Sequence, residues 1–202
     1  MQDELLQRIR GYSPQLLMTP GNFPEAAVLV PITRGEEPQL VLTLRASGLS
    51  THGGEVAFPG GRRDPEDRDL MHTALREAQE EVGLPPGLVE LVGPLSTLVS
   101  RHGIKVTPYV GLVPDYVEYR PNDGEIAAVF SVPLRFFLDT PCEVTHRIDF
   151  RGESWYVPCY RYGKFKIWGL TAIMIVELVN LAYDAGIEMR RAPASYIDLT
   201  GR

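Results

Sequence analysis

Residues 53–84 read GGEVAFPGGRRDPEDRDLMHTALREAQEEVGL, and the end of this stretch decides the fold. Three carboxylates stand there, at Glu77, Glu80 and Glu81. Because each residue of an α-helix turns the chain by about 100°, all three fall within an arc of about 100°. Like charges at this spacing repel one another. We therefore expect a helix face that needs an external positive charge, such as a divalent metal ion.

An apolar stripe runs along the same predicted helix, centred about 140° around it from the carboxylates. Its members recur at i, i+4, i+7 and i+11 and are Met71, Leu75, Ala78 and Val82. Asp67 and Asp69 compete for the N-cap. Gly83 suits the position after the last helical residue, and the prolines at 85–86 prevent continuation. The sequence thus predicts a helix that ends at about Val82, with one buried face and one acidic face.

The chain has 202 residues, of which 44% are hydrophobic and 23% charged, and this suits one domain with a sizeable core. Its formal net charge of -6 disfavours binding to a nucleic-acid backbone, which requires a basic surface. An anionic substrate must then meet local basic side chains or a metal ion. We expect a small-molecule substrate and no nucleic-acid partner, and we leave a homodimer open.

Nothing in the sequence predicts secretion or membrane insertion. The N-terminus carries acids at Asp3 and Glu4 and has no long apolar core. The most apolar run, residues 167–176, has about half the length that a membrane span needs. Cys142 and Cys159 form no CxxC motif, which favours free thiols in a reducing compartment. We therefore expect a cytoplasmic protein without a membrane partner.

Short apolar runs separated by turns predict strands on both sides of the acidic helix. Before it we expect a helix at 3–10, a connector at 19–24, a hairpin across 26–45, and a strand at 55–58 that residues 59–61 end. After it we expect strands at 88–92, 95–99 and 106–113, a strand or helix at 125–130, a short helix or packed turn at 132–138, a hairpin of 143–150 with 153–161, and a buried helix at 167–183.

This order of elements predicts an α/β sandwich with a mixed sheet. We expect a single domain over residues 1–202. Within it, residues 1–24 form an N-terminal helix and connector, 25–184 the core, and 185–202 a polar tail.

Residues 61–84 resemble the signature of the Nudix hydrolase family. That signature is a glycine, an acid six residues later, and then Arg-Glu, an apolar residue, any residue, Glu-Glu, any residue, glycine and an apolar residue. Gly61, Asp67 and the run from Arg76 to Leu84 follow it. There are two departures, because Asp67 replaces the usual glutamate and eight rather than seven residues separate it from Arg76. The resemblance implies the Nudix fold, an α/β/α sandwich with a mixed β-sheet.

A second resemblance, to the coenzyme A pyrophosphatase branch of that family, extends over about residues 26–180. Before the helix it rests on Leu42 to Ala46, Leu49, His52, Gly54 to Val56 and Phe58 to Gly61. Ser50 stands where the branch usually has arginine. Downstream the resemblance rests on 106–108, 122–125, 132–134 and 167–172. It implies cleavage of the diphosphate of coenzyme A, or of an acyl or oxidised derivative, to 3′,5′-adenosine bisphosphate and 4′-phosphopantetheine or its derivative.

Two other functions stay open at this point. The first is a Nudix hydrolase for another nucleoside diphosphate derivative, such as ADP-ribose or a dinucleotide polyphosphate. The second is a catalytically silent Nudix-like domain that binds a nucleotide as a regulator. Such domains typically lose one or more of the helix acids, whereas this chain keeps all three.

Hydrolysis of a pyrophosphate requires that negative charge around phosphorus be neutralised and that a water be activated. Mg2+ or Mn2+ bound by Glu77, Glu80 and Glu81 would do both, because hard cations take carboxylate oxygens. The resemblance adds the backbone carbonyl of Gly60 as a further ligand, and a glycine permits that close approach.

The expected catalytic set is Arg76, Glu77, Glu80 and Glu125. The resemblance implies that Arg76 holds a catalytic glutamate in place by an ion pair. The general base stays open between Glu77 on the helix and Glu125, which follows the turn at 121–124.

Side chains next to the acidic helix in sequence are the candidates for substrate binding, namely Arg45, His52, Glu55, Arg62 and Arg63. A chain of net charge -6 needs local positive charge where an anionic substrate binds. Glu55 is equally well explained as a strand-edge residue paired with an arginine, and His52 as a residue that orders its loop. Arg101, His102 and Lys105 form a basic loop that is either plain surface or a contact for the extra phosphate of coenzyme A.

Overall fold

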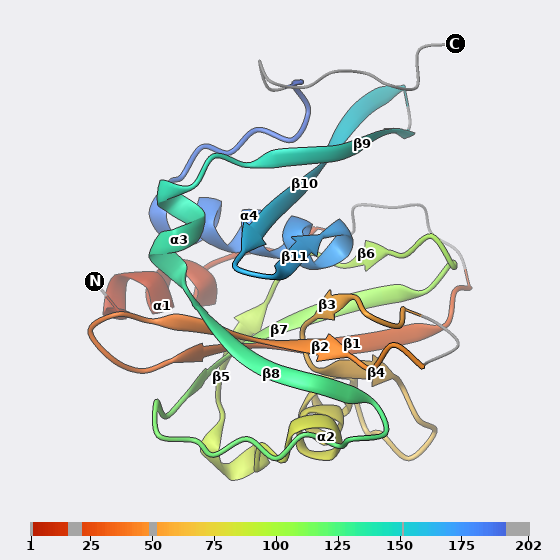
Figure 1. The fold of residues 1–202 in the computed structure, drawn as a ribbon, viewed down its shortest axis with the longest axis vertical. Coiled ribbons are helices and arrows are strands. Elements are labelled where there is room, and N and C mark those ends of the chain that lie inside the picture. The colour runs from red at the N-terminus through yellow and green to blue at the C-terminus, as the bar shows by residue number, and fades with distance from the viewer. Residues whose placement is uncertain (1, 16–21, 49–51, 151, 193–202) are drawn as a thin grey trace.

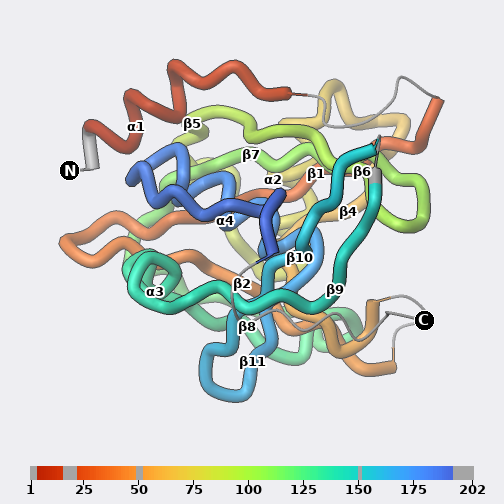
Figure 2. The backbone as a smooth tube through the Cα atoms, turned by 90° about the horizontal axis from the view of Figure 1, so that it is seen from above, coloured from red at the N-terminus to blue at the C-terminus, as the bar shows by residue number. Residues whose placement is uncertain are grey.

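The computed structural model describes residues 2–15, 22–48, 52–150 and 152–192. Within them, eight strands form a mixed sheet in the order β3-β2-β1-β7-β5, with β4 on β1, β6 on β7 and β8 on β2. The strands are β1 (Glu25–Thr33), β2 (Gln39–Arg45), β3 (Val56–Ala57), β4 (Gly60–Arg62), β5 (Glu90–Pro94), β6 (Leu98–Val99), β7 (Lys105–Val113) and β8 (Ile126–Pro133). The central strands β1 and β7 are parallel, and Figure 2 shows β5, β7, β1, β2 and β8 following one another across the molecule.

Helices cover both faces of this sheet (Figure 1). One face carries α2 (Leu70–Val82), and the other carries α1 (Gln2–Arg10) and α4 (Gly169–Tyr183). The predicted α/β/α sandwich with a mixed sheet is therefore confirmed. Within the described residues, no helix has both the length and the apolar character that crossing a membrane requires.

Strand β1 separates the two apolar interiors of the sandwich. Ala27 and Leu29 pack into the cluster that contains α2, whereas Val30 and Ile32 pack into the cluster that contains α1 and α4. Successive side chains of a strand point to opposite faces, so a strand covered on both faces has to be apolar at nearly every position. This explains the run AAVLVPI, and the predicted hairpin with β2 is confirmed by the pairing of Ile32 with Leu40.

A second, antiparallel sheet of three strands projects from the sandwich (Figure 1). It consists of β9 (Glu143–Phe150), β10 (Glu153–Tyr162) and β11 (Phe165–Trp168). The predicted hairpin of 143–150 with 153–161 is confirmed as β9 and β10. Of the segment at 125–130, residues 126–130 lie in the strand β8, and the short helix predicted at 132–138 is α3 (Leu134–Asp139).

The prediction lacks one strand and misplaces the start of the last helix. The strand predicted at 55–58 ends before 59, as β3, but residues 60–62 then form β4, which pairs with β1 so that Gly61 lies opposite Ala27. The last helix does not begin at 167, because residues 165–168 form β11 against β10. Gly169, with a φ of 66°, turns the chain from this strand into α4.

Helix α2 ends as predicted, with Gly83 in the left-handed conformation at a φ of 68°. Its buried face differs from the predicted stripe. Ala78 and Val82 are buried as expected, but Ala74 lies beside them and Met71 is 36% exposed. The helix is therefore rotated about its axis relative to the prediction, and this rotation changes which of the acids face solvent.

Candidate active site

Two glycines of β4 let the strand approach both its neighbour and α2. A Cβ atom on Gly60 would lie 2.4 Å from the carbonyl oxygen of Ala27. A Cβ atom on Gly61 would lie 2.5 Å from the carboxylate carbon of Glu77. Any larger residue at 61 would occupy the space that the Glu77 carboxylate fills. The glycine pair therefore sets how closely the helix acids approach the backbone of β4.

Glu81 lies on the buried side of α2, contrary to the prediction that all three acids share a solvent-facing arc. Only 4% of its side chain is exposed. Its Oε1 accepts a hydrogen bond from Nη1 of Arg45 at 2.9 Å, and its Oε2 accepts one from the backbone N–H of Gly60 at 3.0 Å. Burial raises the pKa of Glu81 to about 7, against the opposing effects of these two donors.

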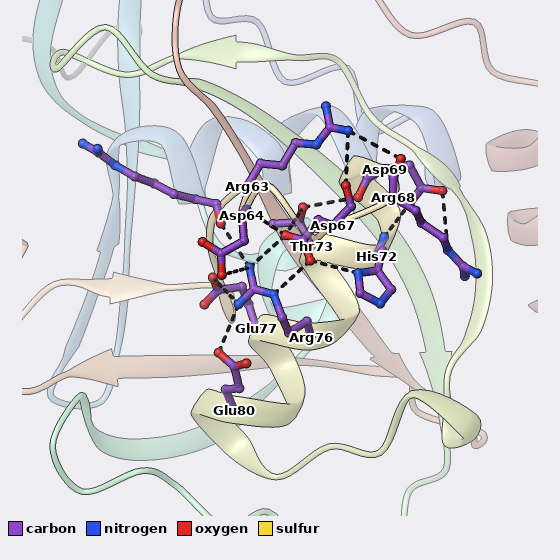
Figure 3. Close-up of polar contacts among 11 residues, drawn as sticks. Arg63, Asp64, Asp67, Arg68, Asp69, His72, Thr73, Arg76, Glu77 and Glu80 are labelled. Atoms are coloured by element: carbon purple, nitrogen blue, oxygen red, sulfur yellow. Dashed lines mark hydrogen bonds and ion pairs between the residues drawn. The ribbon is translucent and has the colours of Figure 1, made fainter.

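Arg76 connects the helix acids to the preceding loop (Figure 3). Its Nε and Nη2 donate to the two carboxylate oxygens of Asp67 at 3.0 and 2.9 Å. Its Nη1 lies 2.9 Å from Oε1 of Glu77 and 3.0 Å from Oε2 of Glu80. One guanidinium thus joins three carboxylates, and the two-point contact with Asp67 fixes its plane.

Asp67 has a role beyond the N-cap position that the helix pattern predicts for it. Its side chain is 1% exposed and also accepts hydrogen bonds from the Thr73 hydroxyl and the Asp64 backbone N–H, both at 2.9 Å. Nδ1 of His72 lies 2.8 Å from its Oδ1. The hydrogen bonds from Arg76, more than any other contact, hold the pKa of Asp67 well below its usual range despite burial.

The two candidate caps of α2 therefore have different roles. Asp69 is the N-cap, because its side chain accepts a hydrogen bond from the backbone N–H of His72 at 2.7 Å. Asp67 instead anchors Arg76. A signal for this was available in the sequence, since Asp67 occupies the acid position of the family signature and Arg76 the arginine position.

Glu77 and Glu125 face the same part of the site. Burial raises the pKa of Glu77, and the adjacent Arg76 opposes that rise. The charges of Glu80 and Glu125 add to it, although Glu125 comes from the turn before β8. The structure therefore brings both candidates for the general base close enough to influence one another electrostatically.

The predicted substrate-binding residues occupy three different settings. Arg45, at the end of β2, lies against Glu81 within the carboxylate group. On the adjoining loop, Oε2 of Glu55 lies 2.7 Å from Nδ1 of His52. Arg63 pairs with Glu25 at 3.1 Å and also donates to backbone carbonyls of the loop before α2 (Figure 3). Arg62 contributes its backbone carbonyl, which accepts a hydrogen bond from Arg76 at 3.1 Å.

The donor set has the chemistry of a site for a hard divalent cation. Glu77, Glu80 and Glu81 supply carboxylate oxygens, and that of Glu81 lies against the backbone N–H of Gly60. Burial disfavours the uncompensated charge on Glu77 and Glu81. Across the part of the chain that the structure describes, no three acidic, histidine or cysteine side chains already converge on one point. The ion pairs explain this, because Arg76 holds Glu77 and Glu80 while Arg45 holds Glu81.

Comparison with known proteins identifies the family of the chain. A model of the NUDIX domain family matches residues 23–155. A Shigella flexneri protein described as an uncharacterized Nudix hydrolase, NudL, is 42% identical over 176 residues, which cover 87% of this chain and 92% of that protein. A Yersinia enterocolitica protein with the same description is 42% identical over 186 residues, covering 88% of this chain and 91% of its own length.

A solved structure supports the fold. The crystal structure of a MutT/nudix family protein from Enterococcus faecalis superimposes with a TM-score of 0.56, at 14% identity, over 91% of this chain and 74% of that one. With the family match over most of the chain, and with the helix acids and their arginine in place, the chain belongs to the Nudix hydrolase family, whose members act on pyrophosphate bonds.

Proposed function

We propose that this protein is a metal-dependent pyrophosphohydrolase that cleaves the diphosphate of coenzyme A, or of its acyl or oxidised derivatives. The products would be 3′,5′-adenosine bisphosphate and 4′-phosphopantetheine or its derivative. One observation carries the substrate proposal. The segment that resembles the coenzyme A branch contacts the helix acids directly, since both Arg45 and Gly60 donate to Glu81. A segment in that position can influence which substrate reaches the acids.

The residues of this chain divide the work of hydrolysis between them. Arg76, fixed by Asp67, orients Glu77 and Glu80. Glu77 or Glu125 accepts the proton of the attacking water, and a raised pKa makes Glu77 a better base near neutral pH. Arg45 supplies positive charge at the edge of the carboxylate group.

Nudix hydrolases generally use divalent cations. We propose Mg2+ or Mn2+, held by Glu77, Glu80, Glu81 and the carbonyl of Gly60. When bound, such a cation neutralises phosphate charge and lowers the barrier to nucleophilic attack on phosphorus. The three acids are the part of the site that a silent nucleotide-binding domain would not need to keep, and their retention supports catalysis.

The test is an assay that resolves products by anion-exchange chromatography. Purified protein is incubated with coenzyme A, ADP-ribose or a dinucleotide polyphosphate, each with Mg2+, with Mn2+ and with EDTA. We expect 3′,5′-adenosine bisphosphate from coenzyme A with either cation and none with EDTA. Faster cleavage of ADP-ribose or of the dinucleotide would contradict the coenzyme A proposal and favour a Nudix hydrolase for that substrate. Cleavage of none of them would favour a regulator that binds nucleotide without hydrolysis.

The metal proposal is tested separately with Glu81→Gln. This change keeps the size of the side chain and removes a ligand charge, so we expect at least a hundredfold loss of kcat, on the scale of removing one key electrostatic group. Glu36→Gln, on the exposed turn between β1 and β2, is the matched control. Full activity of Glu81→Gln would contradict the metal proposal. A cytoplasmic location stays a prediction from the sequence.

A further inference from the structure

Two loops that are far apart in sequence bring histidines together beside the carboxylate site. The rings of His52 and His102 meet edge to face, with centroids 5.2 Å apart. His52 lies on the loop after β2, and His102 lies on the turn between β6 and β7. Both loops lie at the same end of the sheet in Figure 1. Nε of Arg101 donates to Nε2 of His102 at 3.2 Å, so a guanidinium adjoins the pair.

His52 is held in one orientation. Its φ of 57° lies in the left-handed region, which residues other than glycine rarely adopt. Its Nδ1 is 2.7 Å from Oε2 of Glu55, and its carbonyl accepts the backbone N–H of Glu55 at 3.2 Å. Because Nδ1 is engaged, the ring nitrogen on the opposite side, Nε2, is the one left for a ligand.

Arg101 differs in its partners from the arginines of the carboxylate site. The arginines of the carboxylate site pair with acids, as in Arg45 with Glu81 and Arg76 with Asp67. In the described residues, Arg101 contacts no carboxylate and donates to an imidazole instead. Glu55 is the acid that contacts this group, and His52 already occupies it. In a chain of net charge -6, a guanidinium without an acidic partner fits an external anion.

The cluster is connected to the acids by backbone contacts. The N–H of Arg45 donates to the carbonyl of Glu55 at 3.0 Å, and the N–H of Gly54 donates to the carbonyl of Arg45 at 3.1 Å. The side chain of the same Arg45 lies on Glu81. A ligand whose diphosphate occupies the carboxylate site can therefore extend a second anionic group toward His102.

We propose that Arg101, His102 and His52 form a subsite for a phosphomonoester on the nucleotide half of the substrate. This assignment rests on the proposed function, and in a coenzyme A-type substrate the group is the 3′-phosphate of the ribose. A guanidinium and two imidazole N–H groups are donors that suit a phosphate, and their hydrogen bonds to it are charge-assisted. The subsite would distinguish coenzyme A from nucleoside diphosphates that lack the extra phosphate.

The kinetic test compares coenzyme A with dephospho-coenzyme A, which lacks that phosphate. We expect Arg101→Ala and His102→Ala each to raise KM for coenzyme A by about tenfold with little change in kcat, and to leave dephospho-coenzyme A unaffected. Arg101→Lys keeps the charge and should restore part of the loss. Arg135→Ala, an exposed arginine on α3, is the matched control and should change neither substrate. Equal losses on both substrates would overturn the subsite.

A binding measurement separates this inference from the proposed function. Isothermal titration with adenosine 3′,5′-bisphosphate and with 5′-AMP requires no turnover. We expect the wild-type protein to prefer the bisphosphate and Arg101→Ala to lose that preference. Equal affinity of the wild-type protein for both ligands would refute the subsite even if coenzyme A is cleaved. A preference for the bisphosphate without cleavage of coenzyme A would keep the subsite and refute the proposed reaction.

Discussion

Asp67 and Glu81 are both buried acids next to an arginine, yet their surroundings shift their pKa values in opposite directions. Asp67 receives hydrogen bonds from Arg76, Thr73 and a backbone N–H, and its pKa falls. Glu81 receives one bond from Arg45 and one from Gly60, too few to offset burial, and its pKa rises. Hydrogen bonds from Arg76 outweigh burial at Asp67, whereas burial outweighs the two donors at Glu81, so Asp67 is the more stable of the two as an anion. Asp67 is thus stabilised as an anion by the Arg76 guanidinium. The Glu81 carboxylate lacks enough compensating positive charge, which a bound cation would supply.

Asp67→Asn should destabilise the protein by about 3 kcal/mol, because it leaves the half-buried Arg76 without its principal partner. We also expect kcat to fall, since Arg76 would no longer be held against Glu77. Urea denaturation measures the stability. Asp64→Asn is the control, as Asp64 is exposed and lies 3.8 Å from Arg76, and it should cost less than about 1 kcal/mol. Equal effects of the two changes would contradict the role assigned to Asp67.

The pH dependence of stability follows from the lowered pKa of Asp67. The unfolded chain takes up the proton first as pH falls, so the stabilisation is complete above the ordinary carboxyl pKa of about 4. Wild-type protein should therefore lose stability as pH drops from 4 towards 2. Asp67→Asn should show a shallower acid loss in urea titrations across that range. An identical acid profile for the two proteins would show that Asp67 is not the source.

Glu81 predicts the opposite sign. Its pKa of about 7 in the folded protein exceeds the ordinary value of about 4.3, so the folded state binds the proton more tightly. In EDTA, stability should fall as pH rises from 4.5 to 7, by on the order of 2–3 kcal/mol from this group. Glu81→Gln should remove that part of the fall, and adding Mg2+ to the wild-type protein should reduce it. Unfolding midpoints across pH, with and without Mg2+, provide the measurement.

At the scale of elements, β4 and α2 are fitted to one another through the paired glycines. The Cβ that Gly60 lacks would meet backbone atoms of β1, which cannot move without separating the strands. The Cβ that Gly61 lacks would meet the end of the flexible Glu77 side chain. The first glycine therefore serves the sheet, and the second serves the position of the Glu77 side chain.

These two substitutions should separate stability from activity. Gly61→Ala should lower kcat by about a hundredfold by displacing Glu77, at a cost in stability below about 1 kcal/mol. Gly60→Ala should cost about 3 kcal/mol or more through overpacking against β1. Paired urea denaturation and turnover measurements on both variants test this. If Gly61→Ala keeps full activity, Glu77 does not have to occupy the space above Gly61.

Elements with a strong local pattern could be predicted from the sequence, and those fixed by distant partners could not. The β1–β2 hairpin was predictable from two short apolar runs separated by a turn, and the end of α2 from Gly83, because both signals are local. The strand β4 has no apolar pattern, and it forms because its backbone pairs with β1. Residues 165–168 join α4 in one apolar run, and a run of that kind does not distinguish a strand from a buried helix.

The site follows the same division. The positions of Glu77, Glu80 and Arg76 on one helix follow from their spacing. The contact of Arg45 with Glu81 joins residues 36 positions apart, and the anchoring of Arg76 by Asp67 crosses a loop. Neither contact follows from a helical or strand period. The orientation of Glu81 depends on the rotation of α2, which the whole core sets.

At the scale of the whole molecule, α1 belongs to the interior under α4. Leu5 and Ile9 are buried in the same cluster as the apolar residues of α4. Ile9→Ala should therefore cost about 2–4 kcal/mol, as for a fully buried aliphatic side chain. Leu138→Ala, at a side chain with 37% exposure on α3, is the control and should cost less than about 1 kcal/mol. Urea denaturation followed by tryptophan fluorescence measures both, and equal stabilities would place α1 outside the core.

The parallel pairing of β1 with β7 affects how the chain is made. Residues 25–33 pair in register with 105–113, so each partner in the ladder is 80 residues from the other. On the ribosome, β1 emerges long before its neighbour, and until then one edge of an almost wholly apolar strand has no ladder partner. The pairing of β1 with β7 cannot be completed before residue 113 has left the exit tunnel, and contacts between residues so far apart in sequence form slowly. The first half of this chain therefore cannot complete the central sheet until its partner strand β7 has been synthesised.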